Sequence, residues 1–119
     1  MDPFQTPFIV ALSAGEANGG AFAVVPAGNR AVIEHVSVYA TGIGARSADY
    51  FITSTIEDNS TFREVPIVTQ VGAAGAVLGS HSFRAFASPD TQFGAVIRRN
   101  NTAGQVVATF VLAGYFEPV

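Results

Sequence analysis

The sequence consists of short β-rich segments, each closed by a cluster of turn residues. Val, Ile, Thr, Phe and Tyr dominate the segments, and Gly, Pro, Asn, Asp and Ser dominate the gaps between them. Strand-length segments that recur with turn signals between them predict an all-β sandwich or barrel. The clearest unit is Val24–Thr41, where a strand end, a Pro-Ala-Gly-Asn turn and a long second strand follow one another. Proline fixes φ and glycine permits positive φ, so this turn has a physical basis.

Eight strands are predicted along the chain, at Gln5–Ser13, Ala21–Val25, Arg30–Thr41, Asp49–Ile56, Thr61–Val71, Val77–Ala87, Gln92–Arg99 and Gln105–Glu117. Pro66 cannot donate to a ladder, so its strand is expected at a sheet edge or with a bulge. Phe83 and Phe86 cannot share one face of a regular strand, and a bulge would reconcile them. We therefore expect a single domain over residues 1–119, an antiparallel β-sandwich of jelly-roll type. A smaller Greek-key sandwich is the alternative.

The composition restricts the partners and the chemistry. Hydrophobic residues make up 49% of the chain and charged residues only 13%, against about 25% charged in typical domains. Few charges are left to cover the surface, which indicates that part of it is buried against a partner. The net charge of -3 argues against a nucleic-acid partner held by phosphate neutralisation. The chain has no cysteine, which excludes disulfides, thiolate metal sites and cysteine nucleophiles.

All six basic residues are arginine, which reflects either compositional bias or a choice of bidentate contacts at an interface. The more apolar face of the segment Arg30–Thr41 includes Glu34, which predicts that this carboxylate points inward. A buried carboxylate needs a partner. The candidates for a structural ion pair with Glu34 are Arg30, Arg84 and Arg98.

The last predicted strand is apolar on both faces. One face carries Val106, Ala108, Phe110, Leu112 and Phe116, and the other carries Val107, Thr109, Val111, Ala113 and Tyr115. A sandwich strand with a solvated outer face should alternate apolar and polar residues. Either this strand is covered on both sides or its outer face meets another subunit, and we expect the second. The candidate interface residues are Val107, Thr109, Val111 and Tyr115.

The candidates for catalysis are weak. Glu34 and His35 are adjacent on a strand, so their side chains are expected on opposite faces. His35 and His81 lack the nearby carboxylate that a metal site would need. Glu57 and Asp58 read as a solvated turn, and no G-x-S-x-G elbow is present. We therefore predict no catalytic residue, no metal and no cofactor, and a protein that is not an enzyme.

The aromatic residues suggest a second kind of function. Tyr39, Tyr50 and Tyr115 are candidates for stacking against a sugar ring, which would make the chain a glycan-binding or small-ligand-binding module.

One segment resembles a known family. Val25–Ser37 reads VPAGNRAVIEHVS, which is similar to the pattern V-P-A-G-K-R-L-V-I-E-H-V-S of a functionally uncharacterised family of small bacterial all-β proteins. Asn29 stands where lysine is usual. Ala113-Gly114-Tyr115-Phe116 is similar to the S-G-Y-L ending of those proteins. The resemblance implies a β-sandwich and export from the cell, and it carries no catalytic residues.

The sequence gives little information about the cellular location of the protein. No basic residue precedes Arg30, and the apolar run Phe8–Leu12 is short for a signal peptide. The longest apolar-rich run, Val106–Phe116, falls short of the about 20 residues that a helical membrane span needs. The chain is therefore expected to be cytoplasmic as written or a mature form whose leader was removed. An exported location or an assembly surface is favoured over the cytoplasm.

Two functional hypotheses follow. The first is a non-enzymatic structural or assembly protein that forms a homo-oligomer or larger assembly through an apolar sheet face, as a virion or surface component would. The alternative is a glycan-binding or small-ligand-binding module of an exported bacterial protein.

Overall fold

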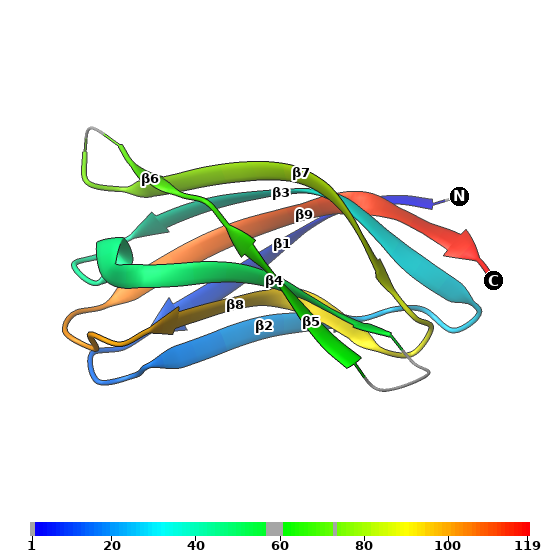
Figure 1. Cartoon of the computed structure of the whole chain (residues 1–119), viewed down its shortest axis with the longest axis horizontal. Coiled ribbons are helices and arrows are strands. Elements are labelled where there is room, and N and C mark those ends of the chain that lie inside the picture. The colour runs from blue at the N-terminus through cyan, green and yellow to red at the C-terminus, as the bar shows by residue number, and fades with distance from the viewer. Residues whose placement is uncertain (1, 57–60, 73) are drawn as a thin grey trace.

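The computed structural model describes residues 2–56, 61–72 and 74–119 and shows two β-sheets packed face to face (Figure 1). Within these residues the strands are β1 Asp2–Leu12, β2 Asn18–Val24, β3 Asn29–Thr41, β4 Ala48–Ile56, β5 Thr61–Ile67, β6 Gln70–Val71, β7 Val77–Ala87, β8 Gln92–Arg99 and β9 Val106–Pro118. A single turn of 3-10 helix, η1 at Ala45–Ser47, lies between the predicted strands Arg30–Thr41 and Asp49–Ile56. The prediction of an all-β antiparallel sandwich is confirmed.

The strands pair in a nested order. β1 pairs with β9, β2 with β8, β3 with β7 and β4 with β5, as if one long hairpin had been folded over. Two further pairings, β3 with β9 and β4 with β8, complete the sheets. The five-stranded sheet has the order β1-β9-β3-β7-β6, and the four-stranded sheet has the order β2-β8-β4-β5. Without the short β6, this is the arrangement of a jelly roll.

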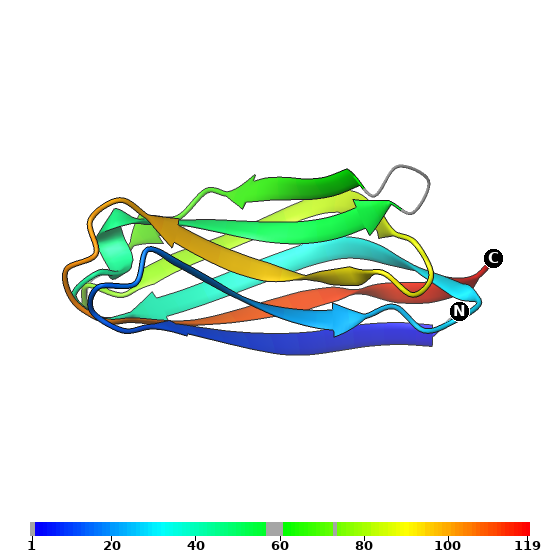
Figure 2. The ribbon, with the colours of Figure 1, turned by 90° about the horizontal axis from the view of Figure 1, so that it is seen from below.

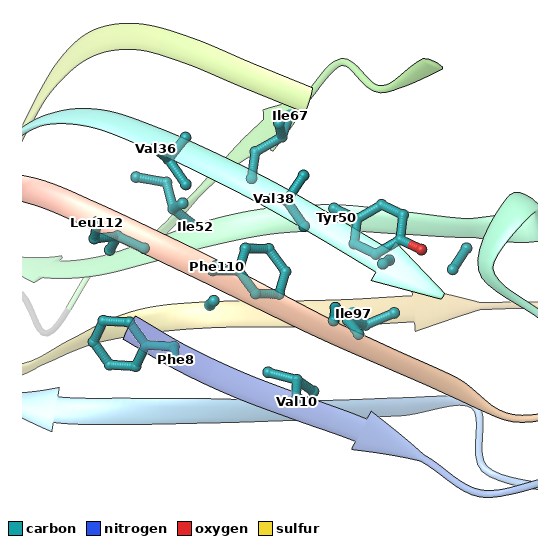
Figure 3. Close-up of a cluster of buried hydrophobic side chains, with 14 of the residues drawn as sticks. Phe8, Val10, Val36, Val38, Tyr50, Ile52, Ile67, Ile97, Phe110 and Leu112 are labelled. Atoms are coloured by element: carbon teal, nitrogen blue, oxygen red, sulfur yellow. The ribbon is translucent and has the colours of Figure 1, made fainter. Parts of the chain in front are cut away.

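The core lies between the sheets because the strands alternate in burial. On β1, Phe8, Val10 and Leu12 point inward and are buried. They belong to one buried cluster with residues of the four-stranded sheet such as Tyr50 and Ile97 (Figure 3). Burying such side chains contributes about 1.5–3 kcal/mol each. The result is an elongated molecule of 43 × 26 × 17 Å in which each sheet has one buried face, and Figure 2 shows it turned by 90° from the view of Figure 1.

The predicted strand Thr61–Val71 is wrong in one respect, because the chain changes sheets within it. β5 ends at Ile67 at the edge of the four-stranded sheet, and β6 then joins the edge of the five-stranded sheet beside β7. This break accounts for a ninth strand. Pro66 lies on the edge strand β5 as expected, where its missing N–H interrupts no inner ladder.

A bulge interrupts the five-stranded sheet at its middle strands. Ile33 and His35 of β3 each pair with a residue of β7 and a residue of β9. Between these two paired positions, β3 has one residue, Glu34, whereas β7 has two residues and β9 has none. The predicted irregularity in Val77–Ala87 therefore exists, at Phe83 and Arg84. It does not place Phe83 and Phe86 on one face, however, because Phe83 packs against the core and Phe86 points outward, 38% exposed.

Candidate functional site

The outer face of the five-stranded sheet carries no formally charged side chain in five successive cross-strand rows. We call these rows the neutral face. They are Ala11–Val107–Thr41, Ile9–Thr109–Tyr39–Leu78–Gln70, Pro7–Val111–Ser37–Ser80, Gln5–Ala113–His35–Ser82 and Pro3–Tyr115–Val32–Phe86. Residues that face each other across antiparallel strands lie side by side on one surface. The rows therefore form one continuous patch across the sheet.

Large apolar side chains on the neutral face are open to solvent. Ile9 is 66% exposed, Tyr39 52% and Leu78 40%, and all three belong to one row. The candidate interface residues Val107, Thr109, Val111 and Tyr115 lie on the same face and are half-buried. On the opposite face of β9, Val106, Ala108, Phe110 and Leu112 are buried in the core, and Phe116 is partly buried against it. Within the described chain β9 is thus covered on one side only, because the two sheets form just two layers.

A hollow of about 400 Å³ lies near the centre of the neutral face. Its walls combine the Tyr39 ring and Leu78 with the hydroxyl-bearing residues Ser37, Ser80 and Thr109. An aromatic ring beside several hydroxyl groups can contact both the apolar side and the hydroxyl groups of a small polar ligand.

The three tyrosines do not form one platform. Tyr39 lines the central hollow, and its cross-strand partner on β9 is Thr109. Tyr115 is half-buried and lies six positions further along β9 than Thr109. That offset is about 20 Å at the usual rise of a strand. Tyr50 is in the core at 2% exposure, and its hydroxyl donates to the Ala45 carbonyl at 2.8 Å. The prediction of Tyr50 as a ligand-stacking residue is therefore wrong.

The buried position of Tyr50 also changes its acidity. Burial raises the pKa of Tyr50 to about 12, with Arg99 acting to lower it and Asp49 to raise it. Desolvation dominates because the phenolate would lose its water on entering the core.

The bulge brings Glu34 and His35 together, against the expectation that they lie on opposite faces. Both line a second hollow on the outer side of the sheet, with Gln5 and Ala113. Glu34 is not buried, since its side chain is 44% exposed, and the expectation of an inward carboxylate is wrong. Its partner is Arg84, at 3.5 Å. A regular strand would separate neighbouring side chains, but the residue added at a bulge breaks the alternation.

The polar groups at this bulge lack the geometry of a catalytic triad. The His35 Nδ1 atom and the Ser82 Oγ atom are 3.2 Å apart. In the part of the chain that the structure describes, no carboxylate contacts His35 to orient its ring, as a triad requires. His81 pairs with the buried Val36 and stacks on Phe83, so it lies on the other face of the sheet from His35. Among the described residues, no three His, Asp or Glu side chains cluster as metal ligands would.

The other two candidate arginines pair away from Glu34. Arg30 bonds Glu117 and lies over the Phe86 ring, 4.7 Å from its centroid. Arg98 pairs with Glu64 on the outer face of the four-stranded sheet, and this hydrogen bond raises the pKa of Arg98 further above its ordinary value. Each of these ion pairs lies within one chain.

Arg99 is a structurally important residue that sequence reasoning missed. It is only 4% exposed, and its guanidinium donates to the carbonyls of Glu16, Ser13 and Ala103 at 2.8, 3.0 and 3.4 Å. These carbonyls belong to the β1–β2 and β8–β9 loops, which meet at one end of the sandwich (Figure 1). The alternation of Phe93, Ala95 and Ile97 on the inward face could have placed Arg99 there.

Comparisons with known proteins add little to this picture. No protein-family model matches the chain, and no curated protein matches it. Among solved structures, the chain is similar to the virus-like particle of extra small virus of the giant freshwater prawn Macrobrachium rosenbergii, solved by cryo-EM. The TM-score is 0.31 and the identity 12%, over 95% of this chain and 80% of that chain. So low a score carries no argument about function. Among the described residues, moreover, no helix has the length and apolarity of a membrane span.

Proposed function

We propose that this chain is a non-enzymatic assembly protein that associates with copies of itself through the neutral face. The observation that carries the proposal is the row Ile9–Thr109–Tyr39–Leu78–Gln70, which crosses all five strands and exposes three large apolar side chains. Exposed apolar patches of several hundred Å² are uncommon on soluble monomers and mark interaction sites.

The size of the neutral face suits a second copy. It spans three to five strands at about 4.8 Å and nine positions at about 3.4 Å, or roughly 600–700 Å². Two such faces in contact would bury roughly 1,200–1,400 Å², which lies in the lower part of the range for specific interfaces.

The charge distribution also suits a second copy. A two-fold contact brings each residue of a face against the same face of the partner, so charges of one sign would repel. The five rows contain none, and the nearby Glu34 and Arg84 neutralise each other. The outer face of the four-stranded sheet differs, because Asp49, Glu64 and Arg98 interrupt it.

Sedimentation velocity over a concentration series tests this proposal. Wild type is expected to associate with rising concentration, and Ile9→Glu and Val111→Arg are expected to form smaller particles than wild type at the same concentration. Val68→Glu is the matched control, because Val68 is 83% exposed but lies outside the neutral face. A wild type that stays monomeric at high concentration would contradict the proposal, as would equal loss of association in all three variants.

The central hollow favours a second candidate, a binding site for a glycan. Tyr39 exposes half of its surface beside Ser37, Ser80 and Thr109, which is the mixture of ring and hydroxyl groups that suits a sugar. A glycan array probed with wild type and with Tyr39→Ala tests it. Binding that Tyr39→Ala abolishes and Tyr115→Ala preserves would support this candidate, and absence of binding to any sugar would refute it.

A further inference from the structure

The edge strand β2 presents a second surface that could associate, distinct from the neutral face. Among the described residues β2 pairs only with β8, so its other side is a free sheet edge, along the lower margin of Figure 1. Alternate N–H and C=O groups of an antiparallel edge strand point away from its sheet and are free to pair with another strand.

The other exposed edges in the described chain carry features that oppose pairing, and β2 carries none. β1 contains Pro3 and Pro7, which have no N–H to donate. β5 contains Pro66 beside two charged residues, and β6 has only two residues. β7, which runs on beyond β6, carries Arg84 and the bulge. Edge prolines, charges and bulges are the usual protection against edge-to-edge pairing.

The sequence of β2, Asn18-Gly19-Gly20-Ala21-Phe22-Ala23-Val24, has neither proline nor charge. Two of its outward side chains, Phe22 and Val24, are large and apolar, and they are 45% and 59% exposed. We propose that β2 pairs with β2 of a second copy, antiparallel about a two-fold axis at Ala21, which joins two four-stranded sheets into one of eight strands.

The register follows from the length and the side chains of β2. A two-fold axis at Ala21 overlaps all seven residues, so that Asn18 faces Val24 and Gly20 faces Phe22 of the second copy. Each large outward side chain then faces a smaller one. The Phe22 ring already lies over Gly20 of its own strand, where an added Cβ would be 2.8 Å from a ring carbon. The pairing therefore brings the two Phe22 rings next to each other. A second copy is the occupant that fits, because an uncharged strand does not repel itself.

Single cysteines test the register cleanly, because the chain has none of its own. Cysteines at position 21 would face each other across the axis with Cα atoms about 4.5–5.5 Å apart, within the range of a disulfide. Cysteines at position 23 would be four positions out of register, about 14 Å apart. Ala21 and Ala23 are both partly buried against the core, so Ala23→Cys is a matched control for Ala21→Cys.

Under mild oxidation we expect Ala21→Cys to form a covalent dimer at least tenfold faster than Ala23→Cys. Adding Val24→Lys, a charge on an exposed edge residue, should remove the Ala21→Cys cross-link. Adding Ile9→Glu should leave it unchanged, which separates this contact from the neutral face. A cross-link absent from Ala21→Cys, equal in the two cysteine variants, or unaffected by Val24→Lys would overturn the proposal.

Discussion

Arg99 shows how a single side chain can hold one end of the sandwich together. Its guanidinium is buried among backbone carbonyls of two loops, and within the described chain no carboxylate pairs with it. A buried charge is tolerated only when its hydrogen bonds are satisfied. The three hydrogen bonds that the guanidinium donates meet that condition. The backbone N–H of Arg99 also donates a hydrogen bond, to the Ala17 carbonyl.

Arg99→Ala should lower the free energy of unfolding by about 3–5 kcal/mol, because three charge-assisted hydrogen bonds are lost and their carbonyls are left in a buried site. Urea unfolding at neutral pH measures this. Arg98→Ala is the control, since Arg98 is exposed and its ion pair with Glu64 contributes little to stability. Equal stability of the two variants would show that the Arg99 contacts do not hold the loops.

Tyr50 predicts a loss of stability at alkaline pH. An unfolded tyrosine releases its proton near pH 10, whereas folding raises the pKa of Tyr50 to about 12. Between these values the folded state binds more protons, so stability falls as the pH rises. By pH 11.5 the loss should reach about 2 kcal/mol relative to pH 8. Unfolding curves of Tyr50→Phe should lack this loss, and parallel pH dependence in Tyr50→Phe and wild type would contradict it.

At the scale of elements, local sequence predicted most of the strands but not where the chain changes sheets. Val77–Ala87 and Gln92–Arg99 have the predicted bounds, because turn residues flank them. The split at Val68–Thr69 follows no turn signal. It depends on which sheet edge is free to receive Gln70, and this is set by distant strands.

The candidate site was predictable only in part, for a similar reason. The two apolar faces of the last strand predicted an outer face that meets another subunit. The burial pattern of β9 shows only that this face is left partly exposed within the chain, and the contact with a second subunit stays a prediction. The bulge that brings Glu34 beside His35 depends on unequal residue numbers in β9, β3 and β7. No single strand contains that information.

The bulge also predicts that Gly114 cannot be replaced by a larger residue without loss of stability. Gly114 pairs with Ile33 beside the bulge, and a Cβ at Gly114 would collide with the Val32 carbonyl oxygen. Gly114→Ala should therefore destabilise the chain by about 2 kcal/mol or more, because backbone would have to move. In Gly72→Ala the nearest atom is a flexible Leu78 methyl at 3.2 Å, so thermal unfolding should change much less. A stable Gly114→Ala variant would contradict this view of the bulge.

At the scale of the whole molecule, the sandwich has two proposed association surfaces, the neutral face and the β2 edge. Contact through the neutral face would pack the five-stranded sheets of two copies face to face, whereas pairing through β2 would continue the four-stranded sheet into the next copy. A chain with both surfaces can build a layer or a shell rather than only a dimer, because its two contacts run in different directions.

Small-angle X-ray scattering tests the central claim, association through the neutral face, most directly. The Phe22→Lys/Val24→Lys variant removes the β2 contact and leaves the neutral face intact. At high concentration its scattering should fit a particle of about twice the mass of one copy, with the 43 Å length, which runs along the strands, unchanged. Scattering that fits one 43 × 26 × 17 Å copy at every concentration, or growth only along the 43 Å length, would contradict the claim.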